Sequence, residues 1–171
     1  MPCVGRLRVA VLPRGGSFRV HGLSGHPEAA VFAAGSLLSG GYDYIELSTL
    51  QGRVDVSVVL EEWDGPPPVQ PQEWDETASA LVYLRGYVAV GGDAAGRGGG
   101  LRLAGGVGGY RADVRAHERH AVARACDRIM HRFPDSHGPE FRAAEDELRG
   151  REAFLVRVWP AEEAGITPGV R

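Results

Sequence analysis

The chain has 171 residues, which suits one domain with a substantial hydrophobic core and is short for two. All 19 lysine-plus-arginine positions are arginine, and the formal net charge of −3 argues against a general attraction to nucleic acid. No apolar run approaches the roughly 18 residues of a membrane span, and arginines interrupt the apolar start MPCVGRLRVAVLPRGG, so no secretory signal is predicted. Cys3 and Cys126 are too few to define a disulfide framework, so we expect a cytosolic protein.

Alternating apolar residues predict strands through most of the chain. In RVDVSVVL (53–60) and YRADVRAH (110–117) every second side chain is apolar, which is the period of a strand with one face on a core. Further strands are predicted at 6–12, 17–22, 42–47, 78–85, 87–90 and 153–159. Turns rich in glycine and proline separate these runs at short intervals. The pattern favours a mainly β fold, either an antiparallel β-sandwich or a jelly-roll-like barrel.

The apolar period changes from two residues to a helical repeat at about residue 118. A stripe of apolar residues from Val122 to Phe133 predicts one helix, which Pro134 ends. A second short helix is predicted from Pro139 to Arg149. We therefore expect a short helical pair inserted before the last strand. The predicted bounds are 1–160 for a single β-rich domain, about 118–150 for the helical insert and 161–171 for a tail.

No catalytic constellation stands out in the sequence. The loop GGDAAGRGGG (91–100) lacks the Lys-Ser/Thr ending of a phosphate-binding loop and the spacing of a dinucleotide fingerprint. The stretch GLSG (22–25) is one residue too short for the G-x-S-x-G nucleophile elbow. We therefore expect no enzyme activity and no cofactor.

Histidines and one cysteine near the helical insert leave a metal site as an alternative. Imidazole and thiolate groups both suit zinc. The spacing argues against convergence, because one histidine still belongs to a strand and the cysteine belongs to the apolar stripe of the helix. The candidate ligands of this alternative are His117, His120, Cys126 and His131.

A row of arginines on the first predicted helix leaves nucleic-acid binding as a further alternative. Arg124, Arg128 and Arg132 recur one turn apart, and their guanidinium groups could bind phosphates. Arg111, Arg115 and Arg119 could extend the row. No aromatic residues are interleaved, so a solvated helix face is the simpler interpretation.

Charge is unevenly distributed along the chain, with an acidic segment in its first half. Residues 42–76 contain nine acids and one arginine, whereas residues 77–132 contain nine arginines and four acids. Within the acidic segment, EEWDGPPPVQPQEWDE (61–76) places two tryptophans among six acids. Aromatic area surrounded by charges is typical of a protein-binding surface, although the tryptophans could instead be the inward ends of strands. The predicted contact residues are Glu61, Glu62, Trp63, Asp64, Glu73, Trp74, Asp75 and Glu76.

Three short motifs resemble a group of actinobacterial β-rich proteins of unknown function. They are WDE at 74–76, GGYRADVRAH at 108–117 and FLVRVWP at 154–160, the last being a C-terminal strand that ends in Trp-Pro. The resemblance covers roughly residues 42–160, and the group is distantly similar to ComJ-type nuclease inhibitors. The chain departs from the group at 117–152, where a helical pair replaces a charged insert.

These observations lead to one main functional hypothesis. The resemblance and the acidic, tryptophan-bearing edge imply a non-enzymatic protein-binding module, an inhibitor or immunity-type protein that neutralises a basic partner such as a nuclease toxin. Neither nucleic acid nor a membrane is the expected partner. Exposed strand edges are compatible with a homodimer.

Overall fold

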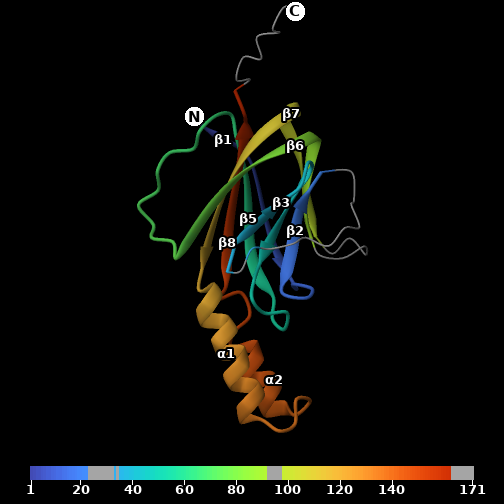
Figure 1. Cartoon of the computed structure of the whole chain (residues 1–171), viewed down its shortest axis with the longest axis vertical. Helices are drawn as coiled ribbons and strands as arrows, with labels where there is room; N and C mark the ends of the chain where they lie inside the picture. Colours follow the sequence, from blue (N-terminus) through green and yellow to red (C-terminus); the bar gives the residue numbers. More distant parts are fainter. Residues whose placement is uncertain (23–32, 34, 92–97, 163–171) are drawn as a thin grey trace, which may run out of the picture.

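The computed structural model describes residues 1–22, 33, 35–91 and 98–162. Most of GLSG (23–25), the middle of GGDAAGRGGG (92–97) and most of the predicted tail (163–171) therefore lie outside the described residues. The chain forms a body of strands, and two helices project from one end of it (Figure 1). The elements are β1 (Cys3–Val11), β2 (Ser17–His21), β3 (Leu38–Gly40), β4 (Tyr44–Ser48), β5 (Val56–Trp63), β6 (Glu76–Gly91), β7 (Gly99–His117), α1 (Arg119–Arg132), α2 (Pro139–Asp146) and β8 (Ala153–Pro160).

Eight strands form one open sheet in the order β1-β5-β8-β7-β6-β2-β4-β3. All neighbouring pairs are antiparallel except β5 and β8, which run parallel. β5 and β8 are parallel because the long hairpin β6–β7 and both helices lie between them in the chain. This connection brings the chain back to the end of the sheet at which β5 begins, so β8 runs in the same direction as β5. The prediction of a mainly β fold with a helical pair before the last strand is confirmed.

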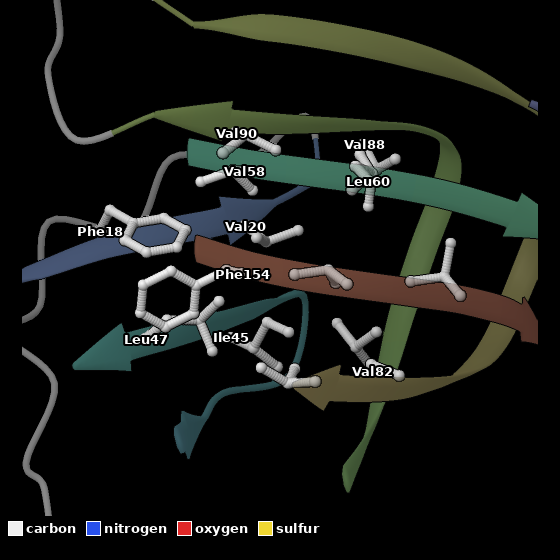
Figure 2. Packing of buried hydrophobic residues seen from close by; sticks show 14 of the residues in the cluster. Phe18, Val20, Ile45, Leu47, Val58, Leu60, Val82, Val88, Val90 and Phe154 are labelled. Carbon is white, nitrogen blue, oxygen red and sulfur yellow. The ribbon is translucent and has the colours of Figure 1, made fainter. Parts of the chain in front are cut away.

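The sheet folds over on itself, so that its two ends enclose one hydrophobic core. Phe18 of β2 and Phe154 of β8 meet edge to face with ring centroids 4.9 Å apart, although β7 and β6 separate their strands in the hydrogen-bonded order. Figure 2 shows the same convergence, with side chains of β2, β4, β5, β6 and β8 packed together. The two layers expected of a sandwich are therefore two parts of one continuous sheet.

The long hairpin of β6 and β7 allows the sheet to fold over. The regular pairing breaks between Arg85 and Tyr87 on β6, where the register with β7 shifts. At this break Gly86 and Gly106 have φ angles of 75° and 73°. Only glycine adopts such angles without steric cost, so the two residues give the hairpin a bend that other residues would oppose.

The helical pair has a small core of its own. Val122 and Cys126 of α1 pack with Leu148 and with Val54, the residue that lies two positions before β5. At the far end of the pair, Phe133 and Phe141 meet edge to face. The apolar stripe predicted from the sequence therefore faces inward. Within the part of the chain that the structure describes, no helix is long and apolar enough to cross a membrane.

Candidate partner-contact site at the junction of sheet and helices

Three of the predicted contact residues lie in the interior. β5 is an interior strand between β1 and β8, and it continues through Glu61, Glu62 and Trp63, all three of which are buried. Glu61 is 1% exposed and accepts hydrogen bonds from the guanidinium of Arg6 and from Nε1 of Trp63, the latter at 2.9 Å. These three side chains were predicted to lie at an exposed partner-binding edge, and the structure buries them instead.

Glu62 has a structural role on the opposite face of β5. Its two carboxylate oxygens accept the backbone N–H groups of Ala104 and Gly105, at 3.0 and 2.9 Å. Ala104 and Gly105 belong to β7, which is not a hydrogen-bonded neighbour of β5 in the sheet. A buried carboxylate therefore joins two layers of the folded sheet by satisfying backbone donors that the bend in β7 leaves free.

The segment 64–75, which we call the connector, joins β5 to β6 and carries four of the remaining predicted contact residues, while the fifth, Glu76, is the first residue of β6. Asp64 and Glu73 are exposed, and Trp74 is half-buried. The connector is held against the sheet by a 3.2 Å hydrogen bond from Nη1 of Arg157 on β8 to the carbonyl oxygen of Pro68. It contains acids but no arginine or histidine, so its exposed surface is negatively charged.

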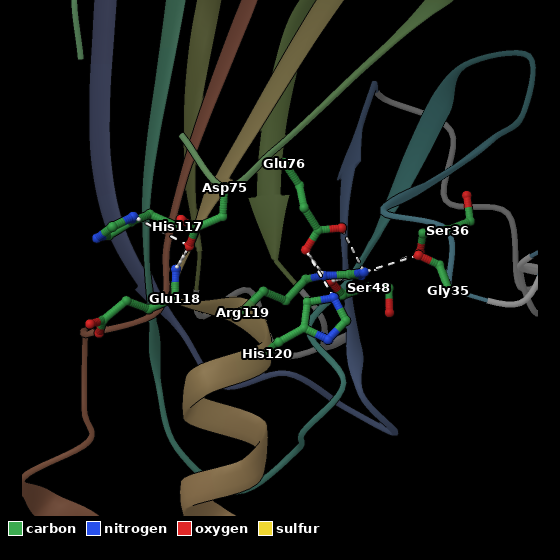
Figure 3. Close-up of polar contacts among 9 residues, drawn as sticks. All are labelled: Gly35, Ser36, Ser48, Asp75, Glu76, His117, Glu118, Arg119 and His120. Atoms are coloured by element: carbon green, nitrogen blue, oxygen red, sulfur yellow. Dashed lines mark hydrogen bonds and ion pairs between the residues drawn. The ribbon is translucent and has the colours of Figure 1, made fainter. Parts of the chain in front are cut away.

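The last connector residue and the first residue of β6 meet the start of α1. Asp75 accepts the backbone N–H of Glu118 at 2.6 Å. Glu118 adopts a left-handed φ of 58° as the chain turns from β7 into the helix, and its carboxylate accepts a hydrogen bond from Arg151. These contacts fix the angle at which the helical pair leaves the sheet. Figure 3 shows this junction between sheet and helices.

Arg119 is the centre of the junction and is 0% exposed. Its guanidinium donates in a fork to the two oxygens of Glu76, from Nε at 2.9 Å and from Nη2 at 3.0 Å. It also donates to the carbonyl oxygens of Gly35, Ser36 and Ser48 at 3.1 to 3.3 Å (Figure 3). One side chain therefore ties α1 to β6 and to the segments around β3 and β4. This role was not predicted from the sequence, in which Arg119 extends a row of arginines expected on the surface.

Two of the predicted metal ligands pair with two of the predicted contact acids. Nδ1 of His117 lies 3.4 Å from Asp75, and Nε2 of His120 lies 3.3 Å from Glu76. Both imidazoles and Asp75 are about half exposed, so this edge of the junction is polar and accessible. An imidazole beside a carboxylate can accept or donate a hydrogen bond to an approaching partner.

The other two predicted metal ligands lie elsewhere. Cys126 is buried in the helical core, where burial raises the pKa of its thiol, and His131 is exposed further along α1. Among the residues that the structure describes, no three histidine, cysteine or acidic side chains converge as a metal site would require. The candidate ligands are divided between the end of β7, the exposed side of α1 and the core of the helical pair.

The predicted arginine row is also divided. Arg124, Arg128 and Arg132 are exposed on α1, and Arg111 is exposed on β7. Arg115 instead pairs with Asp113 at 3.1 Å, and Arg119 is buried. The extension of the row through Arg119 is therefore wrong, because that guanidinium is fully used inside the protein.

A further acid behind the junction was not singled out in the sequence. Glu152, the residue before β8, is 0% exposed. Its Oε2 accepts a 3.0 Å hydrogen bond from Nε2 of Gln51, whereas its Oε1 has no partner among the described residues. Burial raises the pKa of Glu152 to about 8. At this pKa the carboxyl of Glu152 is mostly protonated at neutral pH.

The described chain is a folded mainly β body with a polar junction, and two solved structures share its fold. No protein-family model and no curated protein sequence matches the chain. It is similar to ComJ from Bacillus subtilis, described as an inhibitor of the DNA degrading activity of NucA, with a TM-score of 0.58 and 5% identity over 94% of this chain and 98% of ComJ. It is also similar to the product of crocagin biosynthetic gene J, with a TM-score of 0.51 and 13% identity over 93% of this chain and all of that one. The expected similarity to ComJ is thus confirmed at the level of the fold.

Proposed function

We propose that this protein is a non-enzymatic binding module that inhibits a basic protein partner, with a nuclease as the leading class of partner. The single observation that carries the proposal is the connector, which presents the exposed carboxylates of Asp64 and Glu73 with no basic residue between them. The half-exposed Asp75 continues this negative surface to the junction. Exposed charges of one sign steer the encounter with a partner of the opposite sign.

Two further observations support the proposal. The fold is similar to that of ComJ, which is described as a nuclease inhibitor, and the similarity extends over nearly the whole of both chains. The connector is also anchored, through Arg157 and through the contacts of Asp75 and Glu76 with the start of α1. A partner would therefore meet a fixed arrangement of charges, which reduces the entropy lost on binding.

Reversing the charge of the connector is expected to weaken partner binding. The partner is first recovered by chemical crosslinking in an extract of the source cells, and its affinity for the purified protein is then measured. We expect the double variant Asp64→Arg, Glu73→Arg to raise the Kd by about tenfold or more, with most of the change in the association rate at low salt. If the partner is a nuclease, its activity should fall on addition of one equivalent of wild type and fall less with the variant.

The matched control makes the same change of charge on the helical pair. Asp127 on α1 and Glu147 after α2 are both exposed, so the variant Asp127→Arg, Glu147→Arg alters net charge equally without touching the connector. Its Kd should stay within about twofold of wild type. An equal loss of affinity in both double variants would show that only net charge affects binding. It would contradict the proposal that the connector contacts the partner. A recovered partner that is acidic would contradict the proposal altogether.

A further inference from the structure

A pocket lies between the sheet and the inner side of the connector. Its volume is about 270 Å³. Its floor is one row of side chains across three strands, in which Arg8 of β1 lies opposite Val59 of β5, and Val59 lies opposite Leu155 of β8. The remaining lining residues are Arg6, Glu61, Gln70, Gln72 and Trp74. The position is distinct from the exposed carboxylates on which the proposed function depends.

The lining offers more hydrogen-bond donors than it uses. Its one carboxylate, Glu61, is already engaged by Arg6 and by Trp63. The guanidinium of Arg8 is exposed, and no ion-pair partner for it occurs in the described part of the chain. Trp74 contributes to the lining, but its Nε1 is shielded from solvent, so the donor that the pocket leaves accessible is the guanidinium of Arg8. A charged donor without a partner inside the protein is free to pair with an anionic group of a ligand.

The pocket also has an apolar part. Val59 and Leu155 form the middle and one end of the floor, and the indole ring of Trp74 contributes to the wall. The volume lies slightly below the range of about 300–1,000 Å³ that is typical of sites for drug-sized molecules. The pocket therefore suits a ligand the size of a single side chain or a small organic acid.

We propose that this pocket binds a carboxylate group carried on a small apolar body. Arg8 pairs with the carboxylate, Val59 and Leu155 contact the apolar part, and the indole of Trp74 lies along the wall, where its resonance reports on binding. Guanidinium groups bind carboxylates through two parallel hydrogen bonds, which favours this class of ligand over neutral polar ones. The same chemistry is available from a free organic acid or from a residue of a protein chain.

The test is a titration monitored by the indole N–H resonance of Trp74, which the variant Trp74→Phe identifies by its absence. The probes are 3-phenylpropionate and its neutral counterpart 3-phenylpropanamide. We expect the acid to shift the Trp74 resonance with a Kd on the order of 1 mM, and the amide to bind about tenfold or more weakly. The variant Arg8→Gln should raise the Kd of the acid by about tenfold, whereas Arg124→Gln, the same change on the exposed face of α1, should leave it unchanged.

A second pair of probes separates the two sources of the carboxylate. N-acetyl-Gly-Phe with a free carboxyl terminus resembles a protein segment, and N-acetyl-Gly-Phe amide is its neutral control. Tighter binding of the free peptide than of 3-phenylpropionate assigns the pocket to a protein chain, and the reverse order assigns it to a small acid. Equal affinities for acid and amide would overturn the proposal, and so would a Kd for the acid that Arg8→Gln leaves unaltered. Neither outcome depends on whether the protein inhibits a partner.

Discussion

Replacing Arg119 by methionine is expected to lower the free energy of unfolding by about 3 kcal/mol or more. The guanidinium donates to both oxygens of Glu76 and to the carbonyl oxygens of Gly35, Ser36 and Ser48. Methionine fills much of the same space but donates nothing, so a partly buried carboxylate and three carbonyl groups lose their donor. Urea unfolding followed by circular dichroism measures the effect.

The control for this prediction is Arg124→Met, which makes the same substitution on the exposed face of α1. Its free energy of unfolding should lie within about 0.5 kcal/mol of wild type. Because Arg119 joins the first turn of α1 to β6, amide hydrogens of the helical pair should also exchange faster in the Arg119 variant. If the free energy of unfolding falls no more than in the control, the hydrogen bonds of Arg119 make no net contribution to stability.

The second large effect is expected at Glu152 and depends on pH. Burial raises the pKa of this carboxyl from 4.5 to about 8 in the folded protein, so between these values the unfolded chain has lost the proton and the folded chain keeps it. The folded state then binds more protons than the unfolded state, and stability falls as pH rises through this window. Each unit of difference in pKa corresponds to about 1.4 kcal/mol.

The substitution Glu152→Gln removes this dependence, because an amide is neutral at every pH and can still accept the hydrogen bond from Gln51. We expect the variant to match wild type at pH 4 to 4.5 and to be more stable at pH 8, by an amount on the order of 3–5 kcal/mol. Chemical unfolding at a series of pH values measures the difference. Glu147→Gln, an exposed control, should give a difference that does not grow with pH. A Glu152→Gln profile that runs parallel to wild type would contradict the buried, protonated state.

The local elements of this protein follow from its sequence. Alternation in 53–60 and 110–117 predicts parts of β5 and β7. Successive side chains of a strand point to opposite faces of the sheet, and this holds for any pairing partner. The apolar stripe from Val122 to Phe133, ended by Pro134, predicts α1. Residues three or four positions apart lie on one face of a helix, so the stripe can be recognised from local sequence alone. Exposed Asp64 and Glu73 follow from their place in a proline-rich segment that cannot continue a strand.

Burial of charged residues could not be predicted in this way. Glu61, Glu62 and Arg119 look like surface residues in the sequence, and each is buried because a partner distant in the chain satisfies it: Arg6 for Glu61, backbone N–H groups of β7 for Glu62, and Glu76 for Arg119. Burying a charge is unfavourable until such a partner is present, so the outcome depends on which segments the fold brings together.

The sequence by itself predicted most of the strands, both helices and where the negative charge lies, because those properties depend on neighbours within a few positions; β3 and the glycine-rich first part of β7 were not predicted. Only the tertiary structure decided that β5 lies inside the sheet between β1 and β8, that it pairs in parallel with β8, and that the connector covers a pocket lined by Arg8. These features depend on how the long β6–β7 hairpin bends and returns the chain, and that path is set by contacts between residues far apart in sequence.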